Sequence, residues 1–297
     1  MTSDPALDVF VAHRSLLFTV AYEMLSSAGD AEDVVQETWL RWSEVDLDEV
    51  RDPRAYLVRI ATRQALNRVR TLSRRKEAYV GPWLPEPLLT SPDVADDVEL
   101  ADSVSTAMLL VLETLGPVER AIFVLREVFE LGYDEIARAV DKTPAAVRQI
   151  AHRARSHVAA RRPREVVSAE EGRRVTTRFR QAVETGDLQS LVDVLAPDVV
   201  LMTDGGGVRN AARRPIEGAD KVLRFLSGTL AKTLETVAEI RMVEAEVNGA
   251  PALLVWLGGV LDQAVTVRVE EGLVTGLYLV RNPHKLARMA APTPLAR

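Results

Sequence analysis

The spacing of apolar residues changes once along this chain, and that change constrains the fold more than any other feature. Before Pro197, apolar side chains recur every three or four positions, as in amphipathic helices. After Pro197, several runs alternate with a period of two, as in half-buried strands. A chain of 297 residues also exceeds one typical core. We therefore expect a multidomain protein, with two all-α domains followed by an α+β domain.

Composition excludes several classes of function. The chain has no cysteine, which excludes disulfides, thiolate catalysis and Cys-based zinc sites, and its four histidines lack metal-ligand spacing. Apolar runs such as 253–261 are far shorter than the ~20 residues of a membrane helix. The sequence also does not begin with the basic residues and apolar run that are typical of a signal peptide. We expect a cytoplasmic protein without a cofactor, a structural metal or a membrane partner. The formal charge of −6 argues against indiscriminate nucleic-acid binding, so the local charge distribution has to be considered.

The first helical block, about 6–78, contains an acidic helix followed by a basic one. Asp30 is the expected N-cap of the acidic helix, whose apolar side carries Val35, Trp39 and Trp42. Asp52-Pro53 opens the basic helix, and residues 51–76 contain nine basic residues and one acid. One face of this helix is formed by Arg59, Arg63, Asn67, Arg70 and Arg74. Such a stripe can hold phosphates and contact a base edge, although a plain solvated face is the alternative.

The second block, about 97–162, has the pattern of a helix-turn-helix. A short apolar helix ends at Asp141-Lys142, and Thr143-Pro144 caps a second helix. Val147, Ile150, Ala151 and Ala154 are expected to face the core. Residue types that bind bases and phosphates are left on the outer side. They are Ala145, Arg148, Gln149, His152 and Arg155. An ordinary helical hairpin is the alternative.

The third block begins near Ser168, which caps a helix together with Glu171. Gly186-Asp187 ends that helix, and a second short helix follows. After it we expect the strand VVLMTD and then a helix near 216–230. Turns at Asn248-Gly249 and Glu271-Gly272 separate later strands. Helices followed by such a meander predict a curved sheet covered by one helix layer.

The first two blocks resemble an extracytoplasmic-function sigma factor, the promoter-specificity subunit of bacterial RNA polymerase. GDAEDVVQETWLRW resembles the region-two helix that docks on the polymerase clamp, and RDPRAYLVRIATRQALNRVR the helix that opens and reads the minus-ten element. YDEIARAVDKTPAAVRQIAHRARSHV resembles the region-four reader of the minus-thirty-five element. The resemblance implies region 2 at 1–78, a linker at 79–98 and region 4 at 99–162. The implied partners are promoter DNA and core RNA polymerase, through its beta-prime clamp and beta flap.

Carried over by position, this resemblance implies three sets of contact residues. The polymerase-binding residues are Asp30, Asp33, Gln36 and Glu37. The minus-ten residues are Arg59, Arg63, Asn67, Arg68, Arg70 and Arg74. The minus-thirty-five residues are Thr143, Ala145, Arg148, Gln149, His152 and Arg155. The charges agree, because an acidic face repels DNA and basic faces attract phosphates.

The rest of the chain resembles the sigma subgroup with a fused C-terminal SnoaL-like domain, a cone of the nuclear transport factor type, here 163–288 with a tail at 289–297. That subgroup shares a WLPEP linker motif, a DGGG motif and a late NPxKL motif. In it the fused domain replaces a separate anti-sigma protein. The implied interdomain residues are Trp83, Leu84, Pro85, Asp204, Gly205, Gly206, Gly207, Asn282, Pro283, His284, Lys285 and Leu286. The last motif favours an acid where this chain has His284.

The linker stretch GPWLPEPLL is unusual because its prolines indicate a connector, yet Trp83 and its leucines are apolar. We expect Trp83 and Leu84 to anchor the linker on the cone or on polymerase. The alternative is that Trp83 fills the core of region 2. DGGGVRN could likewise be a plain turn.

Two other functions fit parts of the sequence. A SnoaL-like cone could be an enzyme that uses Asp204, Asp262 or Tyr278, or could sense a ligand without turnover. A helix-turn-helix repressor with an effector domain would leave the acidic helix and the Arg stripe without a role. We therefore favour a non-enzymatic initiation factor whose third domain holds the DNA-binding modules in a compact or poised arrangement, with inhibition and activation both open.

Overall fold

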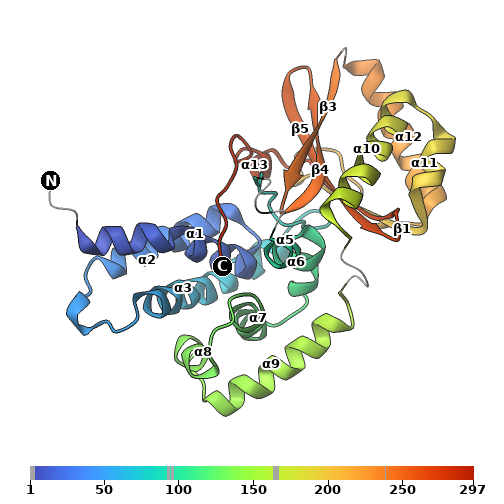
Figure 1. Cartoon of the computed structure of the whole chain (residues 1–297). Helices are drawn as coiled ribbons and strands as arrows, with labels where there is room; N and C mark the ends of the chain where they lie inside the picture. The colour runs from blue at the N-terminus through green and yellow to red at the C-terminus, as the bar shows by residue number, and fades with distance from the viewer. Residues whose placement is uncertain (1–3, 92–93, 95–96, 163–166, 238) are drawn as a thin grey trace. The chain divides into compact units, whose positions relative to one another are not determined.

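The computed structural model describes residues 4–297 except 92, 93, 95, 96, 163–166 and 238, and except the side chains of Ser73 and Arg74. The chain divides into two compact units (Figure 1). Unit 1 comprises Met1–Glu77, Met108–Arg162 and Pro294–Arg297. Unit 2 comprises Ala78–Ala107 and Pro163–Thr293, which includes the C-terminal domain. Its first segment, 78–107, contains the linker expected at 79–98 and the first residues of the region 4 expected at 99–162, and this whole segment is called the linker below. No described helix is long and apolar enough to cross a membrane.

Three long helices form the first part of unit 1. They are α1 (Pro5–Leu25), α2 (Ala28–Trp42) and α3 (Pro53–Glu77), with the 3-10 turn η1 (Leu47–Glu49) before α3. Their core contains Tyr22, Trp42 and Leu57, all fully buried. The indole of Trp42 also donates a hydrogen bond to the carbonyl of Ala6 at 2.8 Å, which satisfies the one polar atom of this buried ring.

The expected N-cap of α2 was wrong by three residues. Ser27 is the N-cap, and its hydroxyl accepts from the backbone N–H of Asp30 at 3.3 Å. Asp30 instead lies in the first turn, where its carboxylate accepts a hydrogen bond from the Ser27 hydroxyl at 2.8 Å. Either residue type can cap a helix, so composition alone did not distinguish the two positions.

The second part of unit 1 contains the expected helix-turn-helix. The helix α6 (Thr106–Leu112) leads to α7 (Pro117–Phe123), the π-helical turn η2 (Val124–Val128), α8 (Tyr133–Val140) and α9 (Pro144–Ala159). Asp141 ends α8 in the left-handed conformation, with φ of 55°. The hydroxyl of Thr143 then accepts from the N–H of Ala146 at 3.2 Å and caps α9. The predicted turn and cap are confirmed.

Unit 2 contains a mixed six-stranded sheet in the order β2-β1-β6-β5-β4-β3. The strands are β1 (Leu195–Asp204), β2 (Ile216–Glu217), β3 (Ile240–Val247), β4 (Ala250–Leu257), β5 (Val260–Glu270) and β6 (Leu273–Val280). Strands β3 to β6 form the expected antiparallel meander, and β1 pairs parallel with β6. The predicted turns at Asn248-Gly249 and Glu271-Gly272 are confirmed, with positive φ at all four residues.

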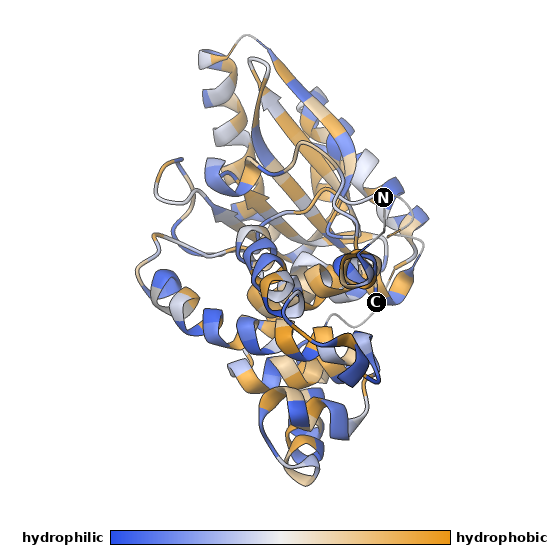
Figure 2. Ribbon diagram, turned by 90° about the vertical axis from the view of Figure 1, so that its left-hand side faces the viewer, coloured by the Kyte–Doolittle hydropathy of each residue, from blue (hydrophilic) through white to orange (hydrophobic). Residues whose placement is uncertain are grey.

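One layer of helices covers the sheet, as expected. It contains α10 (Ala169–Thr185), α11 (Leu188–Val194) and α12 (Ala219–Thr236), which Figure 1 shows together beside the strands. Phe179, Leu191 and Val222 of these helices pack against Val265 and Leu277 of the sheet. In Figure 2 the strands are largely orange, which marks this apolar core. Unit 2 also holds α5 (Val98–Val104) and α13 (Pro283–Leu286).

Candidate functional sites: helix faces and the linker dock

The outer face of α9 is polar and exposed. All six residues expected to contact the minus-thirty-five element are exposed, namely Thr143, Ala145, Arg148, Gln149, His152 and Arg155. Val147, Ala151 and Ala154 are buried on the opposite side, as expected, whereas Ile150 is only half-buried. Arg148, Gln149 and His152 line one surface depression. Arg155 differs from them because it donates to both carboxylate oxygens of Glu127, at 2.7 and 3.1 Å.

Arg68 connects the acidic face of α2 to α3. Its guanidinium donates to Asp30 at 2.8 Å, to Glu37 at 2.9 Å and to Asp33. Burial lowers the pKa of Arg68, but these carboxylates outweigh that effect and raise it. Three of the four residues expected to bind polymerase therefore share one arginine, while Gln36 is exposed beside them.

The Arg stripe on α3 is divided among several environments. Arg63, Asn67 and Arg70 are exposed. Arg63 also donates to the carbonyls of Arg138 at 3.0 Å and Ala139 at 3.4 Å, in the last turn of α8. The stripe thus contacts the helix-turn-helix within unit 1. At the N-terminal end of the stripe, the guanidinium of Arg59 lies 4.4 Å from the ring centroid of Tyr56, a cation–π contact. The side chain of Arg74 lies outside the described residues.

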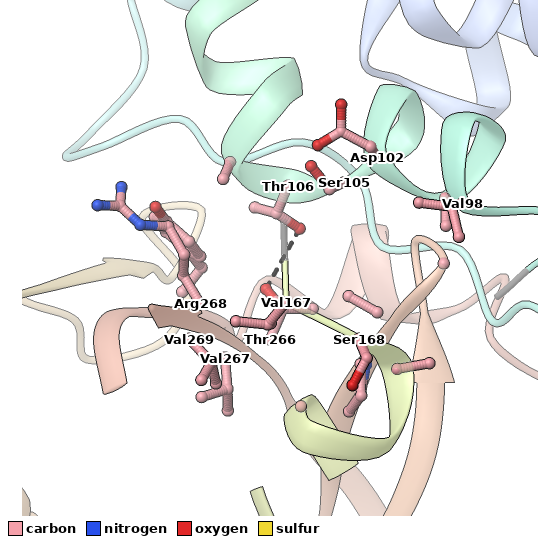
Figure 3. Close-up of a pocket in the computed structure, with 18 residues that line it drawn as sticks. Val98, Asp102, Ser105, Thr106, Val167, Ser168, Thr266, Val267, Arg268 and Val269 are labelled. Carbon is pink, nitrogen blue, oxygen red and sulfur yellow. Dashed lines mark hydrogen bonds between the residues drawn. The ribbon is translucent and has the colours of Figure 1, made fainter. Parts of the chain in front are cut away.

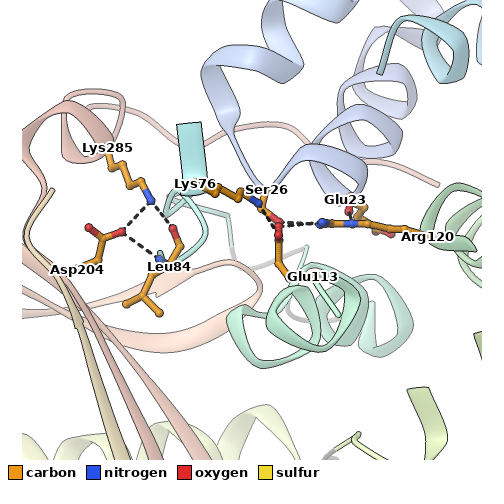
Figure 4. Close-up of polar contacts among 8 residues, drawn as sticks. All are labelled: Glu23, Ser26, Lys76, Leu84, Glu113, Arg120, Asp204 and Lys285. Carbon is orange, nitrogen blue, oxygen red and sulfur yellow. Dashed lines mark hydrogen bonds and ion pairs between the residues drawn. The ribbon is translucent and has the colours of Figure 1, made fainter. Parts of the chain in front are cut away.

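A buried ionic cluster joins α3 to the helices around 113–120 in unit 1 (Figure 4). Glu113 accepts from Lys76 and, at 2.8 Å, from Arg120. Arg120 is 6% exposed and also donates to the carbonyl of Glu23 and the hydroxyl of Ser26, both at 2.7 Å. These residues were not singled out in the sequence, because each looks like an ordinary charge on its own helix.

In unit 2, the linker is held to the C-terminal domain at a site that we call the linker dock (Figure 4). Its centre is the buried carboxylate of Asp204, which accepts from the backbone N–H of Leu84 at 3.0 Å and from Lys285 at 2.8 Å. Lys285 also donates to the carbonyl of Leu84. Both backbone polar groups of one linker residue are therefore paired with a buried ion pair.

Two linker aromatic residues surround this ion pair. The ammonium of Lys285 lies 3.6 Å from the ring centroid of Trp83, and the Tyr79 ring meets Trp83 edge-on at 4.6 Å. The hydroxyl of Tyr79 donates to Asp204 at 2.5 Å and accepts from Asn282 at 2.8 Å. Burial and the neighbouring Asp204 raise the pKa of Tyr79. The dock thus joins the linker motif to both motifs of the C-terminal domain.

The glycines of DGGG allow the backbone to approach its neighbours closely. A Cβ on Gly206 would lie 2.5 Å from the amide carbon of Asn282, and one on Gly205 only 2.2 Å from the carbonyl oxygen of Arg209. Gly206 and Gly207 also have positive φ, of 64° and 71°. Side chains at these positions would collide with the dock or strain the backbone.

The other motif residues flank the dock. Pro85 and Leu286 are buried, whereas Pro283 and His284 are exposed. The N–H of His284 donates to the Asn282 side chain at 3.0 Å, as in a capped first turn. Position 284 therefore contributes its backbone N–H to this cap, while its side chain is exposed.

A second anchor holds the linker further along. The fully buried side chain of Asn248 accepts from the N–H of Leu88 at 3.0 Å and donates to the carbonyl of Val104 at 2.9 Å. Leu89 forms a bridge with Val247, and the N–H of Thr90 donates to Glu246 at 2.9 Å. The sequence indicated Asn248 only as a turn residue. Neither this anchor nor Tyr79 of the dock was predicted.

The three side chains that a catalytic cone could use, two carboxylates and one phenol, do not line the cavity inside the cone. Asp204 is in the dock, Asp262 pairs with Arg281 at 2.7 Å, and Tyr278 alternates with the core residues Leu277 and Leu279. The cavity inside the cone, about 90 Å³, is lined mostly by apolar residues with Thr229, Thr233 and Gln263. Its described lining contains no group that titrates near neutral pH.

Comparisons with known proteins match nearly the whole chain. The family of sigma-70 region 2 matches residues 9–75, and that of sigma-70 region 4 matches residues 105–158. The chain is 35% identical over 306 residues to "ECF RNA polymerase sigma factor SigJ" of Mycobacterium tuberculosis (strain ATCC 25618 / H37Rv), covering 97% of each protein. The chain belongs to the ECF RNA polymerase sigma factors. Like others of this family, this ECF sigma factor binds core RNA polymerase and promoter DNA and directs transcription initiation.

Further matches agree with this assignment. The ECF sigma factor is 32% identical over 291 residues to "Probable ECF RNA polymerase sigma factor SigI" of M. tuberculosis, again covering 97% of each protein. The crystal structure of SigJ matches with a TM-score of 0.77 and 32% identity, covering 96% of this chain and 99% of that chain. The expected fold class is confirmed: two helical sigma modules precede an α+β domain whose mixed sheet fits a SnoaL-like cone. The repressor alternative is not favoured.

Proposed function

We propose that the SnoaL-like domain of this ECF sigma factor regulates initiation in cis by fixing the path of the linker between regions 2 and 4. The linker dock carries this proposal, because a buried ion pair binds both backbone polar groups of Leu84. The Asn248 anchor supports it by binding Leu88 and Val104 with one side chain. A linker held at two points has little freedom to extend.

The proposed sign of this regulation is inhibition. The minus-ten and minus-thirty-five elements lie about 25 base pairs apart, or roughly 85 Å along B-DNA at ~3.4 Å per base pair. Arg63 of the minus-ten face is bonded to the last turn of α8, so regions 2 and 4 are in contact in unit 1. The two modules must separate before both elements can be read, and a docked linker opposes this separation.

The surfaces for polymerase and promoter follow the same arrangement. We assign the α2 face around Asp33, Gln36 and Glu37 to the beta-prime clamp and the region-4 helices to the beta flap. The exposed face of α3 is assigned to the minus-ten strand and that of α9 to the minus-thirty-five major groove. The proposed cis regulation requires no separate anti-sigma protein and no catalysis by the cone, whose described interior lacks a titratable group.

Run-off transcription with purified core RNA polymerase tests the proposed regulation, on promoters selected from genomic DNA. The variant Trp83→Ala removes the ring that covers Lys285 but leaves the SnoaL-like domain itself unchanged. We expect several-fold more transcript than from the wild-type chain, because the docked state is weakened. Leu188→Ala, at an exposed apolar position of α11 that lines neither the dock nor a cavity, is the control and is expected to behave as wild type.

The outcomes separate the parts of the proposal. A transcript level unchanged by Trp83→Ala would contradict regulation through the linker dock. Less transcript would contradict inhibition and make the docked linker a requirement for activity. Lys285→Met provides a second test of the dock, with circular dichroism to show that the domain stays folded.

A further inference from the structure

A second cavity lies in unit 2, under the last part of the linker (Figure 3). Its volume is about 390 Å³. Thr266 and Tyr278 line it and alternate along their strands with the core residues Val265 and Leu277, so they lie on the sheet face away from the cone interior. The core residues Val267 and Val269 also line it, but it shares no lining residue with the small cavity inside the cone, so the two are separate. Its volume falls in the range of small-molecule sites, about 300–1,000 Å³.

Besides the sheet, three parts of unit 2 form the walls of this cavity. Helix α5 and residues 105–107 form the linker wall, and the beginning of α10 forms another. The turn at 249–251 closes the space between them. At that turn, a Cβ on Gly249 would lie 2.6 Å from the Cα of Ala101, so α5 rests directly on the turn. The cavity thus depends on the docked position of the linker.

The lining is mostly apolar and offers no unpaired charge on the sheet side. Only Asp102 and Arg268 are charged among the eighteen lining residues. Arg268 pairs with Glu270 at 3.1 Å and donates to Thr275 at 3.0 Å. Asp102 is not without a partner either, so a charged ligand would lose its hydration here without a new counter-charge. The lining therefore favours an uncharged molecule.

Hydroxyl groups of Thr106, Thr266 and Tyr278 line the cavity and can donate hydrogen bonds. The hydroxyls of Thr106 and Thr266 are bonded at 3.2 Å, as Figure 3 shows, and this pair retains one hydrogen for a further bond. Burial raises the pKa of Tyr278, so its phenol keeps its proton at neutral pH and can donate it. A ligand with an acceptor can therefore bond to these free hydrogens.

We propose that this cavity binds a small uncharged molecule with a rigid apolar body and one hydrogen-bond acceptor, such as an aromatic ketone. Residues 105–107 line the cavity, and the chain enters unit 1 at Met108. A bound molecule therefore restrains the end of the linker that leads into region 4. Binding itself does not depend on the proposed function, whereas any effect of the ligand on transcription does.

Titration of the full chain with 6-propionyl-2-dimethylaminonaphthalene tests the site. This uncharged two-ring ketone fluoresces at shorter wavelength in apolar surroundings. We expect saturable binding with one dye per chain, and slower amide exchange of residues 98–107 and 266–269 in the bound state. Binding that does not saturate would overturn the proposal. Protection confined to 225–233 and 253–257 would also overturn it, because those residues belong to the cone interior.

Variants locate the site independently of exchange. Ala169→Trp places a large ring in the cavity and is expected to weaken dye binding at least tenfold. Thr229→Trp makes the corresponding change in the cone interior and is expected to leave binding unchanged. The reverse pattern would overturn the assignment. If Ala169→Trp fails to fold, Tyr278→Phe serves instead, with a severalfold loss expected because it removes one donor; full retention of affinity would count against the site.

Discussion

Glu113, at the scale of single residues, combines burial with two cationic neighbours. Burial alone would raise the pKa of its carboxyl, but Arg120 and Lys76 outweigh burial and hold it at about 2. This value lies below the ~4.3 of an unfolded glutamate. The resulting stability is therefore present above pH ~4.3 and is lost as the pH falls toward 2. In the same cluster, burial lowers the pKa of Lys76 although Glu113 attracts its charge. The cluster therefore adds less to the free energy of unfolding than the pKa of Glu113 alone implies.

We predict that Glu113→Gln lowers the free energy of unfolding at neutral pH by about 3 kcal/mol, because it leaves two buried cations without their carboxylate. The pH dependence of stability between about 4.3 and 2 should also become shallower. Urea denaturation followed by circular dichroism measures both effects. Glu44→Gln, at an exposed position, is the control. Equal slopes for Glu113→Gln and the wild type would show that the cluster does not carry this linkage.

The sequence indicated which polar residues matter but not what they contact. Arg68 was assigned to DNA and Asp30 to polymerase, yet the two are bonded to each other across two helices. Helical spacing shows which residues share a face, whereas the partner comes from another element. Tyr79 and Asn248 were missed for the same reason, since their bonds span more than 100 residues.

Helix α9, at the scale of elements, supplies the most specific prediction about DNA. Arg148→Ala and Gln149→Ala should each weaken holoenzyme binding to a promoter with an intact minus-thirty-five element. A lost base contact costs ~1–3 kcal/mol, roughly five- to 150-fold in affinity. Competition binding with the holoenzyme measures the loss. Arg174→Ala removes the same charge from an exposed position on α10 and should have no effect. An equal loss on DNA that lacks the element would show that these side chains contact only phosphates.

Local signals explain why most elements were predicted. Thr143-Pro144, Ser168 and Asn248-Gly249 act through hydrogen bonds and backbone angles within a few residues, so their sequence is sufficient. The parallel pairing of β1 with β6 was not predicted, because it joins segments about 75 residues apart. The bridge from Leu89 to Val247 is likewise non-local, and no pattern in the proline-rich linker indicated it.

The distribution of charge matters at the scale of the whole molecule. The chain carries a net charge of −6, yet α3 presents exposed Arg63 and Arg70. The logarithm of DNA affinity falls linearly with the logarithm of salt concentration, and each phosphate that the protein neutralises makes this slope steeper by ~0.9. We predict that Arg70→Ala reduces this slope by about one for the holoenzyme on promoter DNA, while Arg174→Ala leaves it unchanged. An unaltered slope for Arg70→Ala would remove this face of α3 from the promoter contact.

The same salt-slope measurement on an Arg63 variant tests whether regions 2 and 4 separate on the promoter. In unit 1 its guanidinium is bonded to two carbonyls of α8, and a side chain held there is not available to a phosphate. If the two regions separate on the promoter, Arg63→Ala should lower the salt slope by about one, as Arg70→Ala does. If they remain in contact, only Arg70→Ala should do so. Because the polymerase contribution is the same in every variant, the difference between these two slopes reports whether the contact between regions 2 and 4 opens when DNA is bound.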